Sequence, residues 1–221
     1  MTVSLKTLVK MLYFTGLTSE ELEVVKQYIA FEKKIDKGQT LLEEGDETEY
    51  MYLIISGAVK IYKRSINGKE QILNIASTGE SLNDVSTFDG GGSAMDMLAM
   101  TPVHLLAIKK VDIKALFAKF PKIAVNVAGV LAAKVRRDSS LVEVLSFDQV
   151  ISRLARLIIK QTDAEKNLLP LFNQQDLAAI VGTSRVVVNR SLKAMEDQGA
   201  IRLERRRIVV TNRENLENLV K

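Results

Sequence analysis

The spacing of apolar residues changes in character along the chain. In residues 18–32 apolar positions recur every three or four residues after Thr18 and Glu21, whose spacing is that of a capping box, and this predicts an amphipathic helix. From about 33 to 108 they gather instead in short runs rich in β-branched and aromatic side chains, which are typical of strands. These runs read TLL, MYLII, AVKIY, QILNI and VHLLAI.

Glycines separate the predicted strands at regular intervals. Asn67-Gly68, between KIYKRS and KEQILNI, is a strong signal for a tight hairpin turn. The turn glycines are spaced 12, 11 and 11 residues apart, at Gly45, Gly57, Gly68 and Gly79. Regular short strands with this punctuation predict an antiparallel roll or jelly-roll sandwich.

Helical spacing returns after the strands. Residues 111–120 predict a helix that ends at Pro121, and a longer helix follows over about 122–146. One apolar stripe of the long helix has heptad spacing, which is typical of a two-stranded coiled coil and predicts a homodimer. The alternative is a helix buried in one monomeric core. The heptad stripe contains Leu131, Val135, Asp138, Val142 and Leu145, and a neighbouring stripe contains Ile123, Val127, Val130 and Leu141.

The C-terminal third predicts a helix-turn-helix followed by a two-stranded wing. After the amphipathic segment VISRLARLIIKQ, Asn173 is a good N-cap, Gly182 can adopt the left-handed conformation that ends a helix, and Thr183 is expected to cap a second helix. We expect inward-facing side chains at Leu177, Ile180, Val187, Leu192 and Met195. The strands AIRLE and RIVVT then meet across Arg205 and Arg206.

The second helix of such a motif enters the major groove of DNA by its N-terminal end. Arginine matches the paired acceptors of guanine, and a valine methyl suits the methyl group of thymine. Positive charge is segregated accordingly: residues 1–145 hold 18 Lys+Arg and 18 Asp+Glu, whereas residues 146–221 hold 13 and 9. We therefore predict double-stranded DNA as a partner, contacted by Thr183, Ser184, Arg185, Val186, Asn189, Arg190 and Arg206.

Composition excludes several classes of function. The chain has no cysteine, which excludes disulfides, thiolate nucleophiles and cysteine-ligated iron–sulfur or zinc sites. A single histidine, His104, argues against a Ser-His-Asp triad and excludes a multi-histidine metal site. The longest nearly apolar run, 123–133, is too short to span a bilayer, and Lys6 and Lys10 interrupt any signal-peptide core. We predict a cytoplasmic protein with no catalytic residues, no metal and no membrane contact.

The order of these parts resembles the Crp/Fnr superfamily of bacterial transcription regulators. The segments that carry the resemblance are IVGTSRVVVNRSLKAMEDQGAI, LLEEGDETEYMYLIISGAVKIY and NGKEQIL. It implies an α+β protein with an effector-sensing β-roll at 1–120, a dimerisation helix at 121–146 and a winged helix-turn-helix at 147–221. It also implies a homodimer on a pseudo-palindromic operator, a small-molecule effector, and RNA polymerase as a partner. Asn173 and Gln174 match the family's phosphate-contacting helix start, so the resemblance implies DNA contacts by these two residues as well.

The chain departs from that family at two places. Val186 stands where the family commonly has a glutamate, which predicts a half-site nearer TGTA than the family's TGTGA. Asn83-Asp84 and Ser93-Ala94 replace the Gly-Glu and Arg-Ser pairs of the cyclic-nucleotide-binding members, and no Lys or Arg occurs from 81 to 100. A buried cyclic phosphate would lack a cation, so we predict an effector other than cyclic AMP. A haem would need His104 or a non-histidine ligand, and we interpret His104 as structural.

Asp138 interrupts the predicted dimer seam. One hypothesis is that Asp138 and Ser139, with the 83–94 segment, line an effector pocket near the dimer axis. The other is that Asp138 is a polar residue that sets the register of the two helices.

Two further classes of function stay open at this point. One is a ligand-binding module whose winged helix contacts proteins instead of DNA. The other is an enzyme that uses Asp84, Asp89 or Asp96 in the β-roll, although the sequence pairs none of them with a base or a nucleophile.

Overall fold

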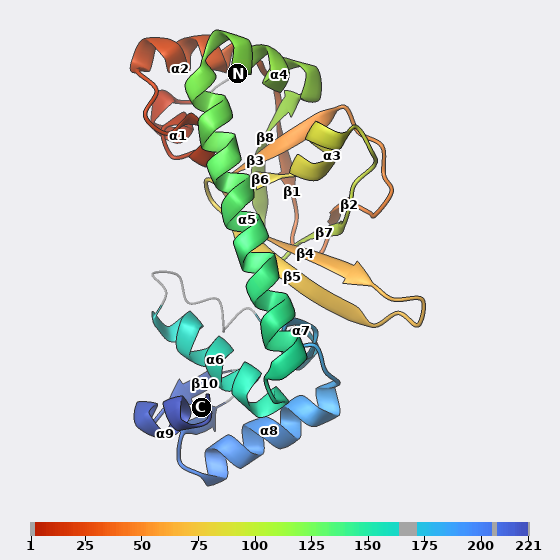
Figure 1. Cartoon of the computed structure of the whole chain (residues 1–221), viewed down its shortest axis with the longest axis vertical. Coiled ribbons are helices and arrows are strands. Elements are labelled where there is room, and N and C mark those ends of the chain that lie inside the picture. The colour runs from red at the N-terminus through yellow and green to blue at the C-terminus, as the bar shows by residue number, and fades with distance from the viewer. Residues whose placement is uncertain (1–2, 164–171, 205–206, 221) are drawn as a thin grey trace. The chain divides into compact units, whose positions relative to one another are not determined.

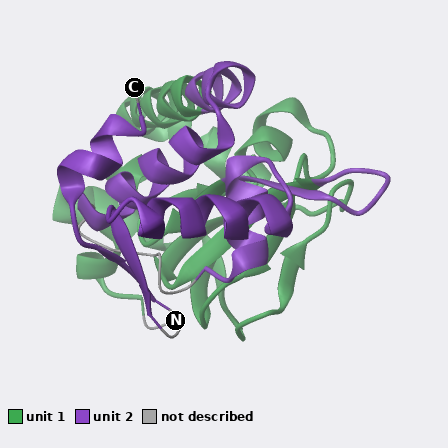
Figure 2. Cartoon of the chain, turned by 90° about the horizontal axis from the view of Figure 1, so that it is seen from below, with its two compact units in different colours: residues 1–63, 74–137 green, residues 64–73, 138–221 purple. Residues whose placement is uncertain are grey.

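The structure is a computed structural model that describes residues 3–163, 172–204 and 207–220. Backbone contacts divide the chain into two compact units (Figures 1 and 2). The N-terminal unit comprises residues 1–63 and 74–137, and the C-terminal unit comprises 64–73 and 138–221. The outer half of one β-hairpin, residues 64–73, is thus grouped with the C-terminal third of the chain.

The N-terminal unit begins with α1 (Leu5–Leu8), the short 3-10 helix η1 (Leu12–Phe14) and α2 (Ser19–Lys26). The predicted capping box is present, because the Glu21 amide donates to Thr18 Oγ1 at 3.2 Å and the Thr18 amide donates to Glu21 Oε2 at 2.7 Å. The expected extension of this helix to residue 32 is wrong. The chain pairs with another strand from Ile29 onward, and this tertiary pairing overrides the local helical spacing.

Two four-stranded sheets form the predicted antiparallel roll (Figure 1), in the orders β1-β8-β3-β6 and β2-β7-β4-β5. The five runs and the hairpin at Asn67-Gly68 predicted from the sequence are confirmed, whereas β1, β6, β7 and the helix α3 (Asp84–Asp89) were not expected. The strands are β1 (Ile29–Ile35), β2 (Thr40–Leu42), β3 (Tyr50–Ser56), β4 (Ala58–Arg64), β5 (Glu70–Ser77), β6 (Ser81–Leu82), β7 (Asp96–Ala99) and β8 (Val103–Lys109).

The central strands β3 and β8 are apolar on both faces because both faces are covered. Successive side chains of a strand point to opposite sides. Met51 and Leu53 accordingly pack in the cluster formed with the N-terminal helices, whereas Tyr52 and Ile54 pack in the cluster between the two sheets. This double burial explains why MYLII and LLAI read as continuous apolar runs and do not alternate.

The helices α4 (Lys110–Lys119) and α5 (Pro121–Phe147) follow the roll, as expected. Ile123 and Val127 of α5 are fully buried in the core of the N-terminal unit, and Leu131 packs against that core. Leu131 is therefore partly covered by its own unit. The large apolar residues of α5 that remain exposed are Val125, Val135, Val142 and the last residue, Phe147, at 70%, 64%, 64% and 83% exposure.

The C-terminal unit contains the predicted winged helix-turn-helix. The preceding helix is α6 (Val150–Asp163); the motif itself is α7 (Gln174–Val181), α8 (Arg185–Asp197), β9 (Ile201–Glu204) and β10 (Arg207–Val210), followed by α9 (Arg213–Asn218). Gly182 ends α7 with a φ of 71°, in the left-handed region that favours glycine. The wing residues Arg205 and Arg206 lie outside the described residues.

Two local predictions for this motif are wrong by one position. Ser184, not Thr183, caps α8, because its hydroxyl oxygen accepts a hydrogen bond from the Val187 amide. Val188, not Val187, is the buried valine, together with Leu192 and Met195. Val188 lies four residues before Leu192 and therefore on the same face of α8, whereas Val187 lies beside that face and is half-buried.

None of the helices in the described part of the chain is both long enough and apolar enough to cross a membrane.

Candidate functional site

The start of α8 presents an exposed, cationic end. Ser184, Arg185, Val186, Asn189 and Arg190 are all exposed. The first turn contains no acidic residue, so the partial positive charge of the helix N-terminus adds to that of the arginines. Such an end attracts phosphates and can offer side chains to base edges.

The first residue of α7 holds the side chain of Arg185. The Arg185 Nε donates to Gln174 Oε1 at 3.0 Å, which links the recognition helix to the first residue of α7. This hydrogen bond uses only the Nε of the guanidinium group. The predicted pair Gln174 and Arg185 is therefore brought together by the fold, although the two residues are 11 positions apart.

Asn173 is held by its own helix. Its side-chain oxygen accepts hydrogen bonds from the Gln175 and Asp176 amides at 2.7 and 2.9 Å, and Asp176 accepts from the Asn173 amide at 3.1 Å. The predicted N-cap is confirmed. A phosphate contact by this residue stays a prediction.

The opposite end of α8 and the wing carry compensated charge. Lys193 lies 3.1 Å from carboxylate oxygens of both Glu196 and Asp197. The Leu203 amide and then Lys193 hold the pKa of Glu196 below its usual range. Arg202 donates to Glu204 at 2.7 Å. Arg185 and Arg190, at the N-terminal end of α8, have no carboxylate partner among the described residues, and Arg207 of β10 is also exposed. Arg206, the predicted wing contact, is outside the described residues.

In the β-roll, the residues predicted to bind an effector are largely buried. Among described residues other than glycine, only Asn83 has a positive φ, 67°. Its side-chain nitrogen donates to the Tyr50 carbonyl at 3.0 Å, while its Oδ1 is buried without a hydrogen-bond partner. Left-handed non-glycine residues are concentrated at functional sites, so this geometry keeps Asn83 a candidate.

Asp84 is neutralised by the protein itself. Its carboxylate accepts hydrogen bonds from the Tyr13 hydroxyl and the Lys134 ammonium group. The side chain of Asp84 is 5% exposed and that of Lys134 is 20% exposed. Burial, followed by the negative charge of Asp84, raises the pKa of the Tyr13 hydroxyl well above its ordinary value, so the hydroxyl remains a donor at neutral pH.

The cations of this region come from distant parts of the chain. Lys134 of α5 also donates to the Ser81 carbonyl at 3.0 Å, and Lys110 of α4 donates to the Ser86 hydroxyl. The segment 81–100 lacks Lys and Arg in its own sequence, yet the fold supplies two lysines to it. Sequence reasoning missed both, and also Tyr13. The only signal was a lysine set among apolar residues in the long helix.

Ser93 and Ala94 lie where the chain runs close to another loop. The Ser93 amide donates to the Asp46 carbonyl at 2.8 Å, and the Ser93 hydroxyl donates to the Met95 carbonyl at 2.8 Å. A Cβ at the adjacent Gly92 would lie 2.5 Å from the Gly45 carbonyl oxygen. Ser93 is fully committed to the fold, whereas Ala94 is half-buried.

Asp138 and Ser139 are exposed on α5 and belong to the C-terminal unit. Whether they join the 83–94 segment in one pocket stays a prediction, as does the alternative that Asp138 sets helix register.

The remaining candidates have structural contacts. His104 Nε2 lies 2.9 Å from Glu32 Oε2 on the adjacent strand, in keeping with a structural histidine. The Asp89 carboxylate accepts a hydrogen bond from the Gly91 amide at 2.9 Å, and the Asp96 carboxylate accepts one from the Glu44 amide at 3.0 Å. The three carboxylates of the enzyme hypothesis therefore hold separate parts of the backbone or, for Asp84, an ion pair.

Comparison with known proteins connects both units to one family. The pattern of the family "Cyclic nucleotide-binding domain" matches residues 32–120, and that of "Crp-like helix-turn-helix domain" matches residues 152–219. The "Cyclic AMP receptor protein" of Thermus thermophilus is 32% identical over 193 residues, which cover 86% of this chain and 88% of that protein. The chain belongs to the Crp/Fnr family of transcription regulators.

Other Crp/Fnr proteins extend the comparison. The "CRP-like cAMP-activated global transcriptional regulator" of Mycobacterium tuberculosis is 28% identical over 187 residues, covering 81% of this chain and 84% of that protein. The solved structure of the c-di-GMP responsive global regulator CLP of Xanthomonas campestris has the same fold, with a TM-score of 0.79 at 19% identity, over 88% of this chain and all of that one. The expectation of a DNA-binding transcription regulator is confirmed, and these relatives are regulators, not enzymes.

Proposed function

We propose that this Crp/Fnr regulator binds a pseudo-palindromic operator as a homodimer, with the start of α8 in the major groove of each half-site. The observation that carries the proposal is the exposed end of α8. Arg185 is oriented there by Gln174, and Val186 is 77% exposed beside it. An arginine and an apolar side chain at the tip of an exposed helix are suited to guanine and thymine edges.

The dimer is supported by the exposed side of α5. Val125, Val135 and Val142 are exposed by more than half their surface, and Ala128, Ala132 and Ser139 complete a three-and-four spacing with them. Exposed apolar residues at heptad spacing are expected to pair with the same helix of a second copy. The stripe shares Val135 and Val142 with the seam expected from the sequence, while Leu131 of that seam packs partly on its own core.

Selection from random-sequence DNA tests the operator and its sequence. The wild type should enrich inverted repeats related to TGTA, and Val186→Glu should move the preference back toward TGTGA, because a glutamate accepts a hydrogen bond from cytosine. A wild type that enriches no palindrome would contradict the proposal. It would favour the alternative of a module that uses its winged helix for protein contacts.

We further propose that the effector is a small molecule other than cyclic AMP, although two relatives are named for that nucleotide. The β-roll segment has serine and alanine where a cyclic phosphate would need a cation. Of the two lysines that reach the segment, Lys134 is engaged with Asp84 and Lys110 with the Ser86 hydroxyl. Calorimetric titration with cyclic AMP should show no binding at millimolar concentration. A tight complex, or an operator affinity that depends on cyclic AMP, would overturn this point.

A regulator of this family is expected to act in the cytoplasm and to contact RNA polymerase when it activates transcription. Reconstituted transcription from a selected operator, with and without the protein, tests that contact. Stimulation of transcription at constant operator occupancy supports a direct contact with the polymerase.

A further inference from the structure

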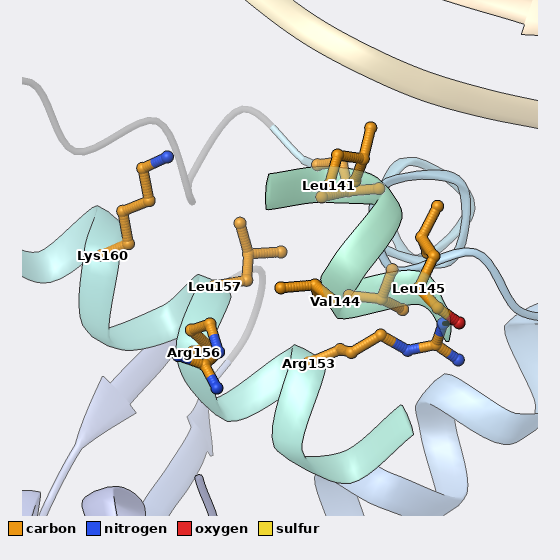
Figure 3. Close-up of a pocket in the computed structure, with 9 residues that line it drawn as sticks. Leu141, Val144, Leu145, Arg153, Arg156, Leu157 and Lys160 are labelled. Atoms are coloured by element: carbon orange, nitrogen blue, oxygen red, sulfur yellow. Dashed lines mark hydrogen bonds between the residues drawn. The ribbon is translucent and has the colours of Figure 1, made fainter. Parts of the chain in front are cut away.

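A pocket of about 130 Å³ lies within the C-terminal unit, between the end of α5, the face of α6 and the end of α7 (Figure 3). Its walls are apolar, and Leu157 and Val144 point toward one another across it. The apolar lining consists of Leu141, Val144, Leu145, Leu157, Ile180 and Val181. A cavity of roughly 150 Å³ accommodates one benzene ring, so the pocket has the size of a single ring or a short branched chain.

Three cations of α6 line one side of this apolar space: Arg153, Arg156 and Lys160. Residues spaced three and four apart lie on one face of a helix, so all three face the same side. Arg156 pairs with Asp148 at 3.1 Å, and Lys160 is exposed. Arg153 is the inner cation, and its Nη1 donates to the Leu145 carbonyl at 3.3 Å.

Arg153 retains an unused donor. Its Nε is buried and has no hydrogen-bond partner among the described residues. A buried donor without a partner costs free energy, and an anion supplied from outside would satisfy it. A planar carboxylate is the group whose geometry best matches a guanidinium edge.

The dimer does not account for this pocket. Successive residues of a helix are about 100° apart, so Leu141 and Val144 lie about 100° and 200° around α5 from the exposed Val142, whereas Leu145 lies close to its side. A second copy that packs on the exposed stripe would therefore leave the Leu141 and Val144 side of the pocket uncovered.

We propose that this pocket binds a small apolar carboxylate, such as an aromatic or short branched-chain acid, and that this ligand is an effector of DNA binding. The ring or chain fills the apolar space and the carboxylate pairs with Arg153, while Arg156 and Lys160 attract the anion to the opening. The site is distinct from the 83–94 segment of the β-roll. The effector role rests on the proposed function as an operator-binding regulator.

The pocket adjoins the turn of the helix-turn-helix. Ile180 and Val181 are the last residues of α7, and a Cβ at the next residue, Gly182, would lie only 2.7 Å from Leu145 Cδ2. The Ile180 carbonyl is in turn held by Gln71 Nε2 at 3.2 Å. A ligand between Leu145 and Ile180 thus contacts the elements that position α8, and must change operator affinity if it binds one arrangement of them better than another.

The test uses the full-length protein and phenylacetate as the probe, with phenylacetamide as its neutral counterpart. Titration calorimetry should show phenylacetate binding at least tenfold more tightly than the amide. Arg153→Met should abolish that preference. Arg156→Met, the same change on the same face of α6, should weaken binding less than threefold, because Arg156 already pairs with Asp148.

Arg153 also donates a hydrogen bond to the Leu145 carbonyl, so Arg153→Met could lose binding by misfolding. A second variant is therefore needed as a control. Leu141→Trp fills the open side of the pocket from a half-buried position and should block phenylacetate while the thermal transition stays cooperative. Equal binding of acid and amide, or binding unaffected by both Arg153→Met and Leu141→Trp, overturns the proposal.

Operator affinity, measured by fluorescence anisotropy, should change at least threefold with saturating phenylacetate. Binding of phenylacetate without any such change overturns the effector role. If the protein binds its operator but not phenylacetate, the inference fails and the proposed function stands. If phenylacetate binds through Arg153 but no DNA is bound under any condition, the proposed function fails and the ligand site stands.

Discussion

The start of α8 and the 81–93 segment of the β-roll differ in where their polar groups find partners. At α8 the side chains of Arg185, Val186 and Arg190 are exposed, and within the described part of the chain Arg185 bonds only to a glutamine of α7. In the β-roll the side chains of Asp84 and Ser93 are buried; Asp84 bonds to a lysine 50 residues away, and Ser93 bonds to the nearby Met95 carbonyl. The first surface is built to bind something else, whereas the second is held together by its own residues.

The largest effect should come from breaking the buried ion pair. Lys134→Met keeps the length of the side chain but leaves the Asp84 carboxylate buried beside a single neutral donor. Removing one partner of a buried pair costs about 3 kcal/mol of unfolding free energy. Denaturant unfolding of the wild type and the variant measures this loss of unfolding free energy.

Two comparisons control for that loss of stability. Lys114→Met removes an exposed lysine of α4 and should change stability by less than about 0.5 kcal/mol. The double variant Lys134→Met/Asp84→Asn should recover part of the loss, because no charge is then left unpaired. If Lys134→Met unfolds like the wild type, the view that the segment is internally neutralised is wrong.

On the exposed surface, the corresponding change should affect binding and not folding. Arg185→Ala should weaken operator binding by about 2 kcal/mol and relax the choice of base, because one bidentate contact is lost. Fluorescence anisotropy titration measures the operator affinity, and thermal unfolding measures the stability of the variant.

Lys193→Ala, in the same helix, is the matched control for this substitution. Its ammonium group is already paired with Glu196 and Asp197, so operator affinity should change less than twofold. Equal losses for the two variants would contradict the placement of the N-terminal end of α8 in the groove.

Tyr13→Phe tests the hydrogen bond to Asp84 in the buried β-roll segment. It removes the hydrogen bond to a charged acceptor and should cost about 1.5 kcal/mol at neutral pH. The pKa of the Tyr13 hydroxyl is raised in the folded protein, so the unfolded chain loses this proton first as the pH rises. Wild-type stability should therefore fall above about pH 10, and the variant should lose less over the same range. Parallel pH profiles would rule out the hydrogen bond to Asp84.

The smallest effect concerns the cap of α7. Asn173→Ala removes the acceptor of two helix amides and should cost about 1 kcal/mol of stability. Asn173→Asp keeps the acceptor and should cost far less in stability, but it places a negative charge where a phosphate is predicted. A selective loss of operator affinity in Asn173→Asp would locate that phosphate, and unchanged affinity would remove Asn173 from the interface.

The same contrast explains which parts were predictable. The helix-turn-helix is encoded by local signals, namely the capping residues around Asn173, the left-handed Gly182 and the apolar positions of α8. The strands with turn glycines were also predictable, because their apolar runs report burial directly. Short strands such as β6 and β7 carry too few residues to show a period, and β1 was masked by helical spacing that pairing with β8 overrides.

The chemistry of the β-roll segment was not accessible in this way. Lys134 lies 50 residues from Asp84 in the sequence, and Tyr13 lies 71 residues away on the other side. No local pattern relates them. The dimer seam stays a prediction: Leu131 and Leu145 have the right spacing, but both also contact apolar residues of their own chain, which spacing alone does not reveal.

The outer half of the β4–β5 hairpin, residues 64–73, contains Gln71 and has a practical consequence for protein engineering. A C-terminal fragment cut at 138 would lack residues 64–73, and with them the donor that satisfies the Ile180 carbonyl and one wall of the space around Gly182. Chimeras that join this DNA-binding module to a foreign sensor should therefore also carry residues 64–73. A single junction in the chain would separate Gln71 from the Ile180 carbonyl to which it donates.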